Sequence, residues 1–287
     1  MSQVSDDLPK NNQGQIDEQA LKAKLIADHQ QATVQKLNFP TEIIGLPSKG
    51  LVYPEGHPLS SGTIELKYMT AREEDILSSA NLIKSGVVID KLLQSIIVTP
   101  INYDDLIVGD KNGIMIAARV LGYGKEYPVE TTCPKCNETT KATIDLTSFD
   151  DKEINPDDYN RTNVYNYTLS KSKRNITFRL LNGHINNLIQ QELKGLQKKS
   201  KASGIDHELT TRLKYIITSV DGNNDVNFIR NFVDNELFAL DSKDFREHIK
   251  NIQPDVITTF DYSCTECSEL IEDVQMPMTT NFFWPRE

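Results

Sequence analysis

Four cysteines stand in two Cys-x-x-Cys pairs, Cys133 with Cys136 and Cys264 with Cys267. Two residues between the thiols let one tight turn present both sulfur atoms to the same ion, as zinc knuckles do. Two such turns complete the tetrahedral set of four sulfur ligands that Zn²⁺ accepts. The spacing therefore predicts one structural Zn²⁺ bound by all four cysteines, although residues 137–263 separate the two pairs.

Other uses of these thiols remain alternatives. A redox pair of the thioredoxin type opens a helix, whose N-terminus lowers the thiol pKa, and neither pair here precedes a helical pattern. Free thiols are the second alternative, and a structural disulfide is disfavoured if the protein is intracellular. With zinc bound, four thiolates leave no open coordination position, so the ion would be structural and would staple two parts of the chain together.

Extended segments flank both cysteine pairs, as the hairpins of a zinc ribbon require. Alternating residues predict strands over 127–132 and 140–146 around the first pair, and over 256–262 and 270–276 around the second. A further strand at 63–69 and a hairpin at 163–181 are predicted in the same way. Apolar residues at helical spacing predict helices over 70–83, 87–98, 104–121, 184–197, 207–220, 226–238 and 242–252.

The two stretches follow one plan, which predicts an internal duplication. Three sets of residues recur, each at its own constant offset along the chain: Ile64 to Leu77 as Ile176 to Ile189, Leu93 to Ile97 as Leu213 to Ile217, and Asp110, Cys133 and Cys136 as Asp241, Cys264 and Cys267. Chance matching of apolar positions is the alternative. The predicted fold is α+β, with internally duplicated helical units whose β-hairpins meet at a shared zinc-ribbon-like site of four cysteines.

This plan divides the chain into six segments. They are a flexible or helical N-terminal arm (1–38), a Pro- and Gly-rich strap (39–62), a first α+β half with its knuckle (63–148), a linker (149–162), a second α+β half with its knuckle (163–277) and an aromatic C-terminal tail (278–287).

Composition excludes several classes of protein. Among 287 residues, 38% are hydrophobic and 25% are charged, which is globular usage. The formal net charge of −10 disfavours a protein that coats nucleic acid, which needs a basic surface. No apolar run is long enough to span a membrane, and the N-terminus has no secretory signal, so we expect a soluble intracellular protein.

No pattern of residues predicts an active site. The five histidines are scattered, and the chain has no Gly-x-Ser-x-Gly elbow, no phosphate-binding Gly-x4-Gly-Lys loop and no EF-hand loop. The sequence therefore indicates a protein that is not an enzyme.

Two segments have the composition of partner-binding elements. The strap contains Pro47, Lys49 and Tyr53, and the C-terminus contains the consecutive aromatics Phe282, Phe283 and Trp284. Aromatic residues are preferred anchors of interfaces. The tail either closes its own domain or inserts into a pocket of another subunit.

Four features together resemble the T4-like bacteriophage base plate protein family. They are the Leu46-Pro47-Ser48-Lys49-Gly50 strap with Tyr53-Pro54, the strand that enters a helix at Thr70, the two Cys-x-x-Cys knuckles and the Phe282-Phe283-Trp284-Pro285 terminus. The resemblance covers residues 40–287. It implies a non-enzymatic protein of the central hub of a contractile tail baseplate, either a hub subunit or a hub assembly catalyst.

The resemblance also implies partners and location. The partners would be other baseplate hub or tail proteins, with the tape measure protein as one candidate, and no nucleic acid or membrane. The location would be the virion tail baseplate and, during assembly, the host cytoplasm. The rival interpretations are a zinc-ribbon module that binds nucleic acid or the transcription machinery, and a thiol oxidoreductase.

Overall fold

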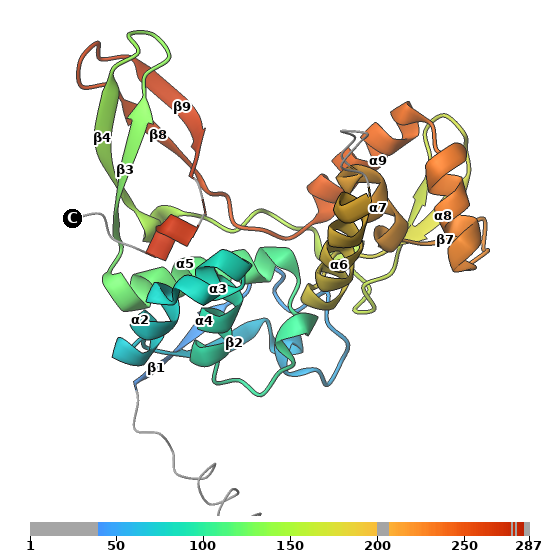
Figure 1. The fold of residues 1–287 in the computed structure, drawn as a ribbon, viewed down its shortest axis with the longest axis horizontal. Helices are drawn as coiled ribbons and strands as arrows, with labels where there is room; N and C mark the ends of the chain where they lie inside the picture. Colours follow the sequence, from blue (N-terminus) through green and yellow to red (C-terminus); the bar gives the residue numbers. More distant parts are fainter. Residues whose placement is uncertain (1–39, 200–206, 277, 279, 284–287) are drawn as a thin grey trace, which may run out of the picture. The chain divides into compact units, whose positions relative to one another are not determined.

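The computed structural model describes residues 40–199, 207–276, 278 and 280–283. Its mixture of helices and short antiparallel strands confirms the predicted α+β class. From Thr41 onward the described residues belong to one compact unit (Figure 1). The predicted N-terminal arm lies outside the described residues.

A two-stranded antiparallel sheet opens the described chain. β1 (Thr41–Gly45) pairs with β2 (Thr63–Lys67) without a register shift. The strap between them includes the 3₁₀ turn η1 (Pro58–Ser61) and buries its apolar side chains in the core. On the opposite edge of β2, Leu66 makes an antiparallel bridge to Ile97, so β2 has a neighbour on each side.

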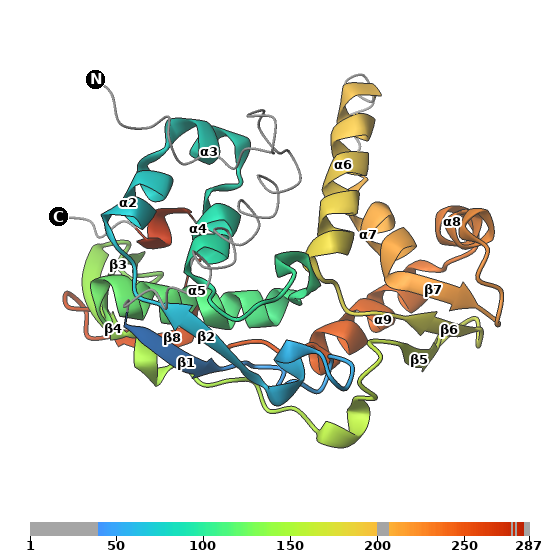
Figure 2. The same ribbon diagram turned by 90° about the horizontal axis from the view of Figure 1, so that it is seen from below.

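Four helices follow this sheet, and Figure 2 shows them beside β1 and β2. They are α2 (Ala71–Ser78), α3 (Ala80–Ser85), α4 (Val88–Ile96) and α5 (Val108–Tyr123). Thr70 and Glu73 form a capping box at the start of α2, in which the Thr70 backbone N–H donates to the Glu73 carboxylate at 2.9 Å. The single helix predicted over 70–83 is wrong in one respect, because the extended backbone of Ser79 (ψ 105°) divides it into α2 and α3.

The second stretch contains a three-stranded antiparallel sheet and four helices. Strands β5 (Tyr165–Thr168), β6 (Asn175–Phe178) and β7 (Ile217–Val220) pair in that order. The helices are α6 (Gly183–Lys199), α7 (Glu208–Ile216), α8 (Val226–Asn235) and α9 (Ala239–Ile252).

Strand β7 corrects the helix predicted over 207–220. The helix ends at Ile216, and residues 217–220 pair with β6. Ile217, Thr218 and Val220 are β-branched, which favours a strand once a pairing edge is available. The helical spacing of Leu213, Ile216 and Ile217 gave no sign of that edge, because the edge comes from residues far away in the chain.

Corresponding residues of the two stretches make the same strand contact. Leu66 bridges to Ile97 in the first stretch, and Phe178 pairs with Ile217 in the second. Phe178 and Ile217 are the residues that the sequence recurrence assigns to Leu66 and Ile97. In both stretches, therefore, the chain leaves one strand, forms helices and returns to pair with that strand at the same place.

The two stretches are joined by backbone pairing as well as by a shared core. Val108 N–H donates to the Leu181 carbonyl at 3.3 Å, and Lys152 N–H donates to the Asp255 carbonyl at 2.8 Å. One cluster of buried apolar side chains includes residues from both stretches. The segment predicted as a linker, 149–162, thus pairs with the chain that leaves α9.

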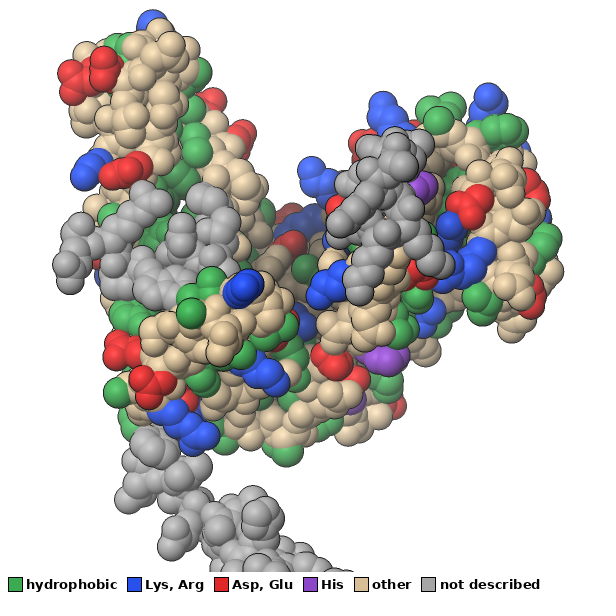
Figure 3. Space-filling view, in the orientation of Figure 1, with side chains coloured by type: hydrophobic (Ala, Val, Ile, Leu, Met, Phe, Trp, Pro, Cys, Tyr) green, Lys and Arg blue, Asp and Glu red, His purple; other side chains and the backbone are tan. Residues whose placement is uncertain are grey.

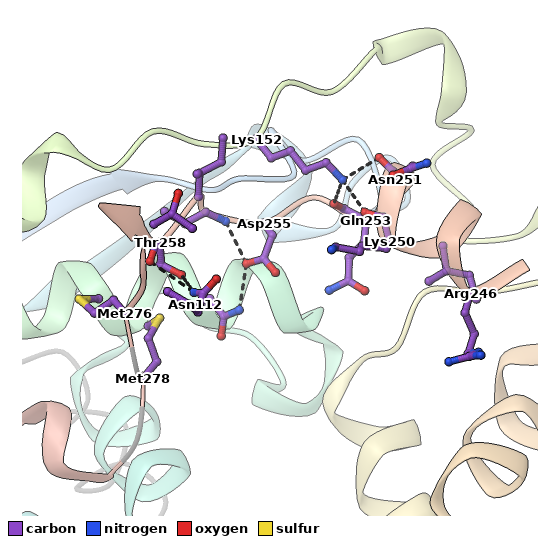
Figure 4. A pocket seen from close by; sticks show the side chains of 15 residues that line it. Asn112, Lys152, Arg246, Lys250, Asn251, Gln253, Asp255, Thr258, Met276 and Met278 are labelled. Atoms are coloured by element: carbon purple, nitrogen blue, oxygen red, sulfur yellow. Dashed lines mark hydrogen bonds between the residues drawn. The ribbon is translucent and has the colours of Figure 1, made fainter. Parts of the chain in front are cut away.

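A cavity of about 700 Å³ lies beside this junction, and Figure 3 shows the molecule hollowed there. The Lys152 ammonium donates to the carbonyls of Asn251 at 2.7 Å and Gln253 at 3.3 Å and so caps the C-terminus of α9 (Figure 4). Asn112 of α5 donates to Asp255 at 2.9 Å across the cavity. The polar groups that face one another here join the two stretches.

Candidate metal centre

Two hairpins present the four cysteines. β3 (Glu126–Thr132) pairs with β4 (Thr139–Asp145), and β8 (Thr259–Ser263) pairs with β9 (Leu270–Gln275). Each Cys-x-x-Cys pair forms the turn at the tip of its hairpin, as predicted. Figure 1 shows the two hairpins side by side, although they lie far apart in the sequence.

The two turns have the same internal hydrogen bonds. The N–H of the first cysteine donates to the carbonyl five residues later, and its own carbonyl accepts from the N–H four residues later. These distances are 2.9 and 2.9 Å after Cys133 and 2.8 and 3.0 Å after Cys264. Both turns close through a left-handed residue, Asn137 (φ 59°) and Ser268 (φ 55°). The two turns are therefore the same knuckle, formed twice.

The four sulfur atoms lie in one cluster. All of them are within 4.8 Å of one another, and Cys133 Sγ to Cys267 Sγ and Cys136 Sγ to Cys264 Sγ are both 3.7 Å. Four sulfurs placed about 2.3 Å from one tetrahedral ion would be about 3.8 Å apart. All four cysteines are free thiols, since none forms a disulfide. Their spacing is that of ligands around a single ion.

Backbone groups favour the thiolate form of one ligand. The N–H groups of Cys267 and Glu266 donate to the Cys264 sulfur and lower the pKa of this thiol to about 6. Metal binding requires deprotonated cysteines, so these N–H groups favour the ligand form of Cys264, whereas burial and the neighbouring thiols raise the pKa of Cys136 and of Cys267. Cys133 and Cys264 are buried, while Cys136 and Cys267 are half-buried.

Two contacts between the hairpins support the cluster from outside. Lys135 of the first knuckle forms an ion pair with Glu269 of the second. Thr140 on β4 donates its hydroxyl to Cys264 Sγ at 3.9 Å. These two contacts join the hairpins next to the sulfur cluster.

The donor set fits one kind of metal chemistry. Four thiolates in a tetrahedral arrangement suit Zn²⁺ and leave no position open for water or a substrate. A redox pair of the thioredoxin type would precede a helix, whereas each knuckle here lies between two strands. The geometry therefore suits a closed structural site.

The sequence was also compared with known proteins. The sequence model of the family described as T4 bacteriophage base plate protein matches residues 53–284, which is most of the chain. The chain belongs to this family. Searches of curated proteins and of solved structures found no match. The family match includes both knuckles of this base plate protein and begins at Tyr53, after the Leu46–Gly50 part of the strap.

Most of the predicted partner-binding residues of this base plate protein are buried within its own chain. Pro47 is buried, and Tyr53 is 4% exposed and donates its hydroxyl to Asp110 at 2.6 Å. Lys49 is exposed. Tyr53 thus holds the strap against α5, and among the strap residues predicted to bind a partner Lys49 is the one that a partner can reach.

The aromatic tail is likewise part of the core. Phe282 and Phe283 are 0% exposed, and Phe282 packs on Tyr127 of β3 with ring centroids 5.2 Å apart. Phe282 and Phe283 therefore close their own domain and do not insert into a pocket of another subunit. Trp284 lies outside the described residues.

Two buried aspartates, Asp110 and Asp241, occupy corresponding positions in the two stretches, and the sequence analysis gives them no role beyond this correspondence. Asp110 accepts hydrogen bonds from the Ser48 N–H at 2.9 Å and the Ser48 hydroxyl at 2.8 Å, and burial raises its pKa. Asp241 accepts from the N–H groups of Lys171 at 2.6 Å and Ser172 at 3.1 Å. Burial opposes ionisation of Asp241, but these hydrogen bonds outweigh it and lower the pKa. The signal for their role was that the two aspartates recur at the same offset as the two cysteine pairs.

None of the helices in the described ranges of this base plate protein has the length and apolar composition needed to cross a membrane.

Proposed function

We propose that this base plate protein is a non-enzymatic structural or assembly protein of the central hub of a contractile phage tail, and that one Zn²⁺ staples its two hairpins. Its partners would be other hub or tail proteins, with the tape measure protein as one candidate. It would reside in the virion tail baseplate and, during assembly, in the host cytoplasm. The family match supports the tail role, and the observation that carries the zinc is the single cluster formed by four sulfur atoms from two distant knuckles with the same hydrogen bonds.

The two hairpins are too small to form a hydrophobic core of their own. Each is a two-stranded sheet, which is marginally stable alone in water. A shared ion bound by both knuckles replaces the core that such small sheets cannot form. The exposed ion pair between Lys135 and Glu269 is too weak to do this, because exposed pairs contribute little to stability.

Internal duplication explains how one site came to be shared. The bridge of Leu66 to Ile97 and the pair of Phe178 with Ile217 support it, as do the two knuckles with one hydrogen-bond pattern. Asp110 and Asp241 support it further, since each is the third residue of its helix and fixes a preceding loop. An ancestral unit with one knuckle would have bound its ion between two copies.

Mass spectrometry tests the proposed role. A hub subunit is present in purified particles of the phage that encodes this chain. An assembly factor is absent from particles but copurifies with baseplate intermediates from infected cells. A chain found in neither, or one that shifts DNA or RNA in a salt-dependent manner, contradicts the proposal and favours the zinc-ribbon nucleic-acid alternative.

A further inference from the structure

The junction inside the chain consists of two short segments that pair through their backbones. Residues 106–108, which we call the socket, lead into α5, and residues 181–183, which we call the plug, lead into α6. Val108 N–H donates to the Leu181 carbonyl at 3.3 Å, and Gly183 N–H donates to the Leu106 carbonyl at 3.1 Å. Between them Ile107 bridges to Asn182 and is only 1% exposed.

The chain contains a second copy of each segment. The offset that relates Asp110 to Asp241 places a second socket at residues 237–239, at the start of α9. The offset that relates Leu66 to Phe178 places a second plug at residues 69–71, at the start of α2. The two sockets have the same backbone conformation, since Ile107 (φ −72°, ψ 160°) and Phe238 (φ −64°, ψ 147°) are both extended, apolar helix caps.

This second pair of segments is open. Within the described residues, the Leu237 carbonyl and the Ala239 N–H of the second socket have no hydrogen-bond partner, and neither do the Met69 carbonyl and the Ala71 N–H of the second plug. These are the groups that correspond to the four paired ones of the internal junction. Phe238 is 48% exposed where its counterpart Ile107 is buried.

We propose that a second copy of this chain docks head to tail, with its second plug (69–71) paired to the second socket (237–239) as the first plug pairs to the first socket. The proposal rests on the proposed internal duplication. Figure 1 shows α2 and the α8–α9 region on opposite sides of the ribbon, so both segments can be engaged at once. Contact between different surfaces of identical chains builds a closed ring or an open filament.

Charge complementarity favours this occupant. Lys171 lies over the Phe238 ring, with its ammonium 4.8 Å from the centroid, and exposed Lys243 is one turn further along α9. The first turn of α2, beside the second plug, exposes two acidic residues, Glu74 and Asp75, and one basic residue, Arg72. A docking copy therefore brings acidic side chains to a basic socket.

Two differences separate the two junctions. A Cβ at Gly183 of the first plug would lie 2.9 Å from the Asp104 Cα, and the counterpart of Gly183 in the second plug is Ala71, so the second plug must sit slightly farther from its socket. The Pro254 carbonyl passes so close to Gly109 that a Cβ there would lie 1.7 Å from its oxygen, and the counterpart of Gly109 in the second socket is Leu240. A docking copy cannot approach α9 that closely. The Leu240 side chain, 50% exposed, offers apolar contact at this place instead.

Proline substitutions test the pairing with little effect on the fold. Ala239→Pro and Ala71→Pro each remove one of the open N–H groups at the first residue of a helix, where proline is tolerated. The residues before them are extended, as proline requires. In sedimentation of the full chain over a concentration series, we expect wild type to associate and both variants to remain monomeric at unchanged melting temperature.

A mixture of the two variants tests the polarity. Ala71→Pro keeps an intact second socket and Ala239→Pro keeps an intact second plug, so an equimolar mixture should form dimers and nothing larger. The same change at the internal junction, Val108→Pro, is the matched control and should lower the melting temperature, because its N–H is already used.

Several results would overturn the proposal. They are a wild type that stays monomeric throughout, variants that associate like wild type, or normal association of Ala71→Pro alone, which would indicate a symmetric contact. If Ala239→Pro melts early, Phe238→Ser replaces it, with the same expected loss of association. A monomeric wild type that binds another hub protein through Phe238 also contradicts docking of a second copy. A monomer that binds zinc and is found in particles would leave the proposed function standing.

Discussion

Asp110 and Asp241 occupy the same place in two helices that lie far apart in the chain. Each is the third residue of its helix, each is 0% exposed, and each accepts hydrogen bonds from the loop that connects the first two strands of its stretch. A carboxylate near a helix N-terminus is favoured by the helix dipole. The two residues therefore fix the hairpin loop of each half against the helix that leads to its knuckle.

Replacing Asp110 should destabilise the whole fold. Asp110→Ala leaves the Ser48 N–H, the Ser48 hydroxyl and the Tyr53 hydroxyl without their acceptor in a buried place. Unsatisfied buried donors are costly, so we expect a loss of about 3 kcal/mol in the free energy of unfolding, measured with urea. Asp157→Ala, at an exposed aspartate, is the control and should stay within about 0.5 kcal/mol of wild type. Equal stability of the two variants would show that the strap does not depend on Asp110.

The aromatic tail should behave as core and not as a handle. Phe282→Ala removes a fully buried ring, for which we expect a loss of about 3–5 kcal/mol. Leu209→Ala, at an exposed apolar side chain, is the control and should cost about 1 kcal/mol or less. Thermal unfolding followed by circular dichroism distinguishes them. If Phe282→Ala kept its melting temperature but failed to copurify with tail proteins, the tail would be a partner-binding element after all.

Glu73 should make stability depend on pH in the acidic range. Its burial opposes ionisation, but hydrogen bonds from Lys67 and Thr70 outweigh this and lower its pKa from 4.5 to about 2. A lowered folded-state pKa gives stability that is fully present above pH 4.5 and is lost as the pH falls toward 2. The difference in unfolding free energy between wild type and Glu73→Gln should shrink over that interval. A difference independent of pH would mean that the Glu73 charge contributes nothing.

Removing the metal should loosen the hairpins before it affects the rest of the fold. The knuckles close β3–β4 and β8–β9, whereas β5, β6 and β7 belong to the shared core. After chelation, hydrogen exchange measured by mass spectrometry should accelerate in residues 126–145 and 259–275 while β6 stays protected. A uniform increase over the chain would instead make the metal part of the global fold, and no change would remove its structural role.

The sequence correctly predicted those structures that depend on residues close together in the chain. The two Cys-x-x-Cys turns, the strands beside them and the strand that enters a helix at Thr70 depend on neighbours along the chain. The recurrence of the cysteine pairs also pointed to Asp110 and Asp241, although not to the loops they bind.

The error and the alternatives left open concern residues whose state is decided by distant parts of the chain. Residues 217–220 have helical spacing but become a strand, because β6 supplies an edge. Tyr53 and Phe282 have the composition of interface anchors but fill places under α5 and beside Tyr127. Aromatic side chains are favoured both in cores and at interfaces, so composition alone does not distinguish the two.

The central claim is that the four cysteines together bind one zinc ion, and metal analysis of the purified native chain tests it most directly. We expect one zinc per chain by inductively coupled plasma mass spectrometry, and none after any single change of Cys133, Cys136, Cys264 or Cys267 to serine. A metal-free native protein would contradict the claim. So would loss of zinc on changing one pair but not the other, because then the hairpins would not share an ion.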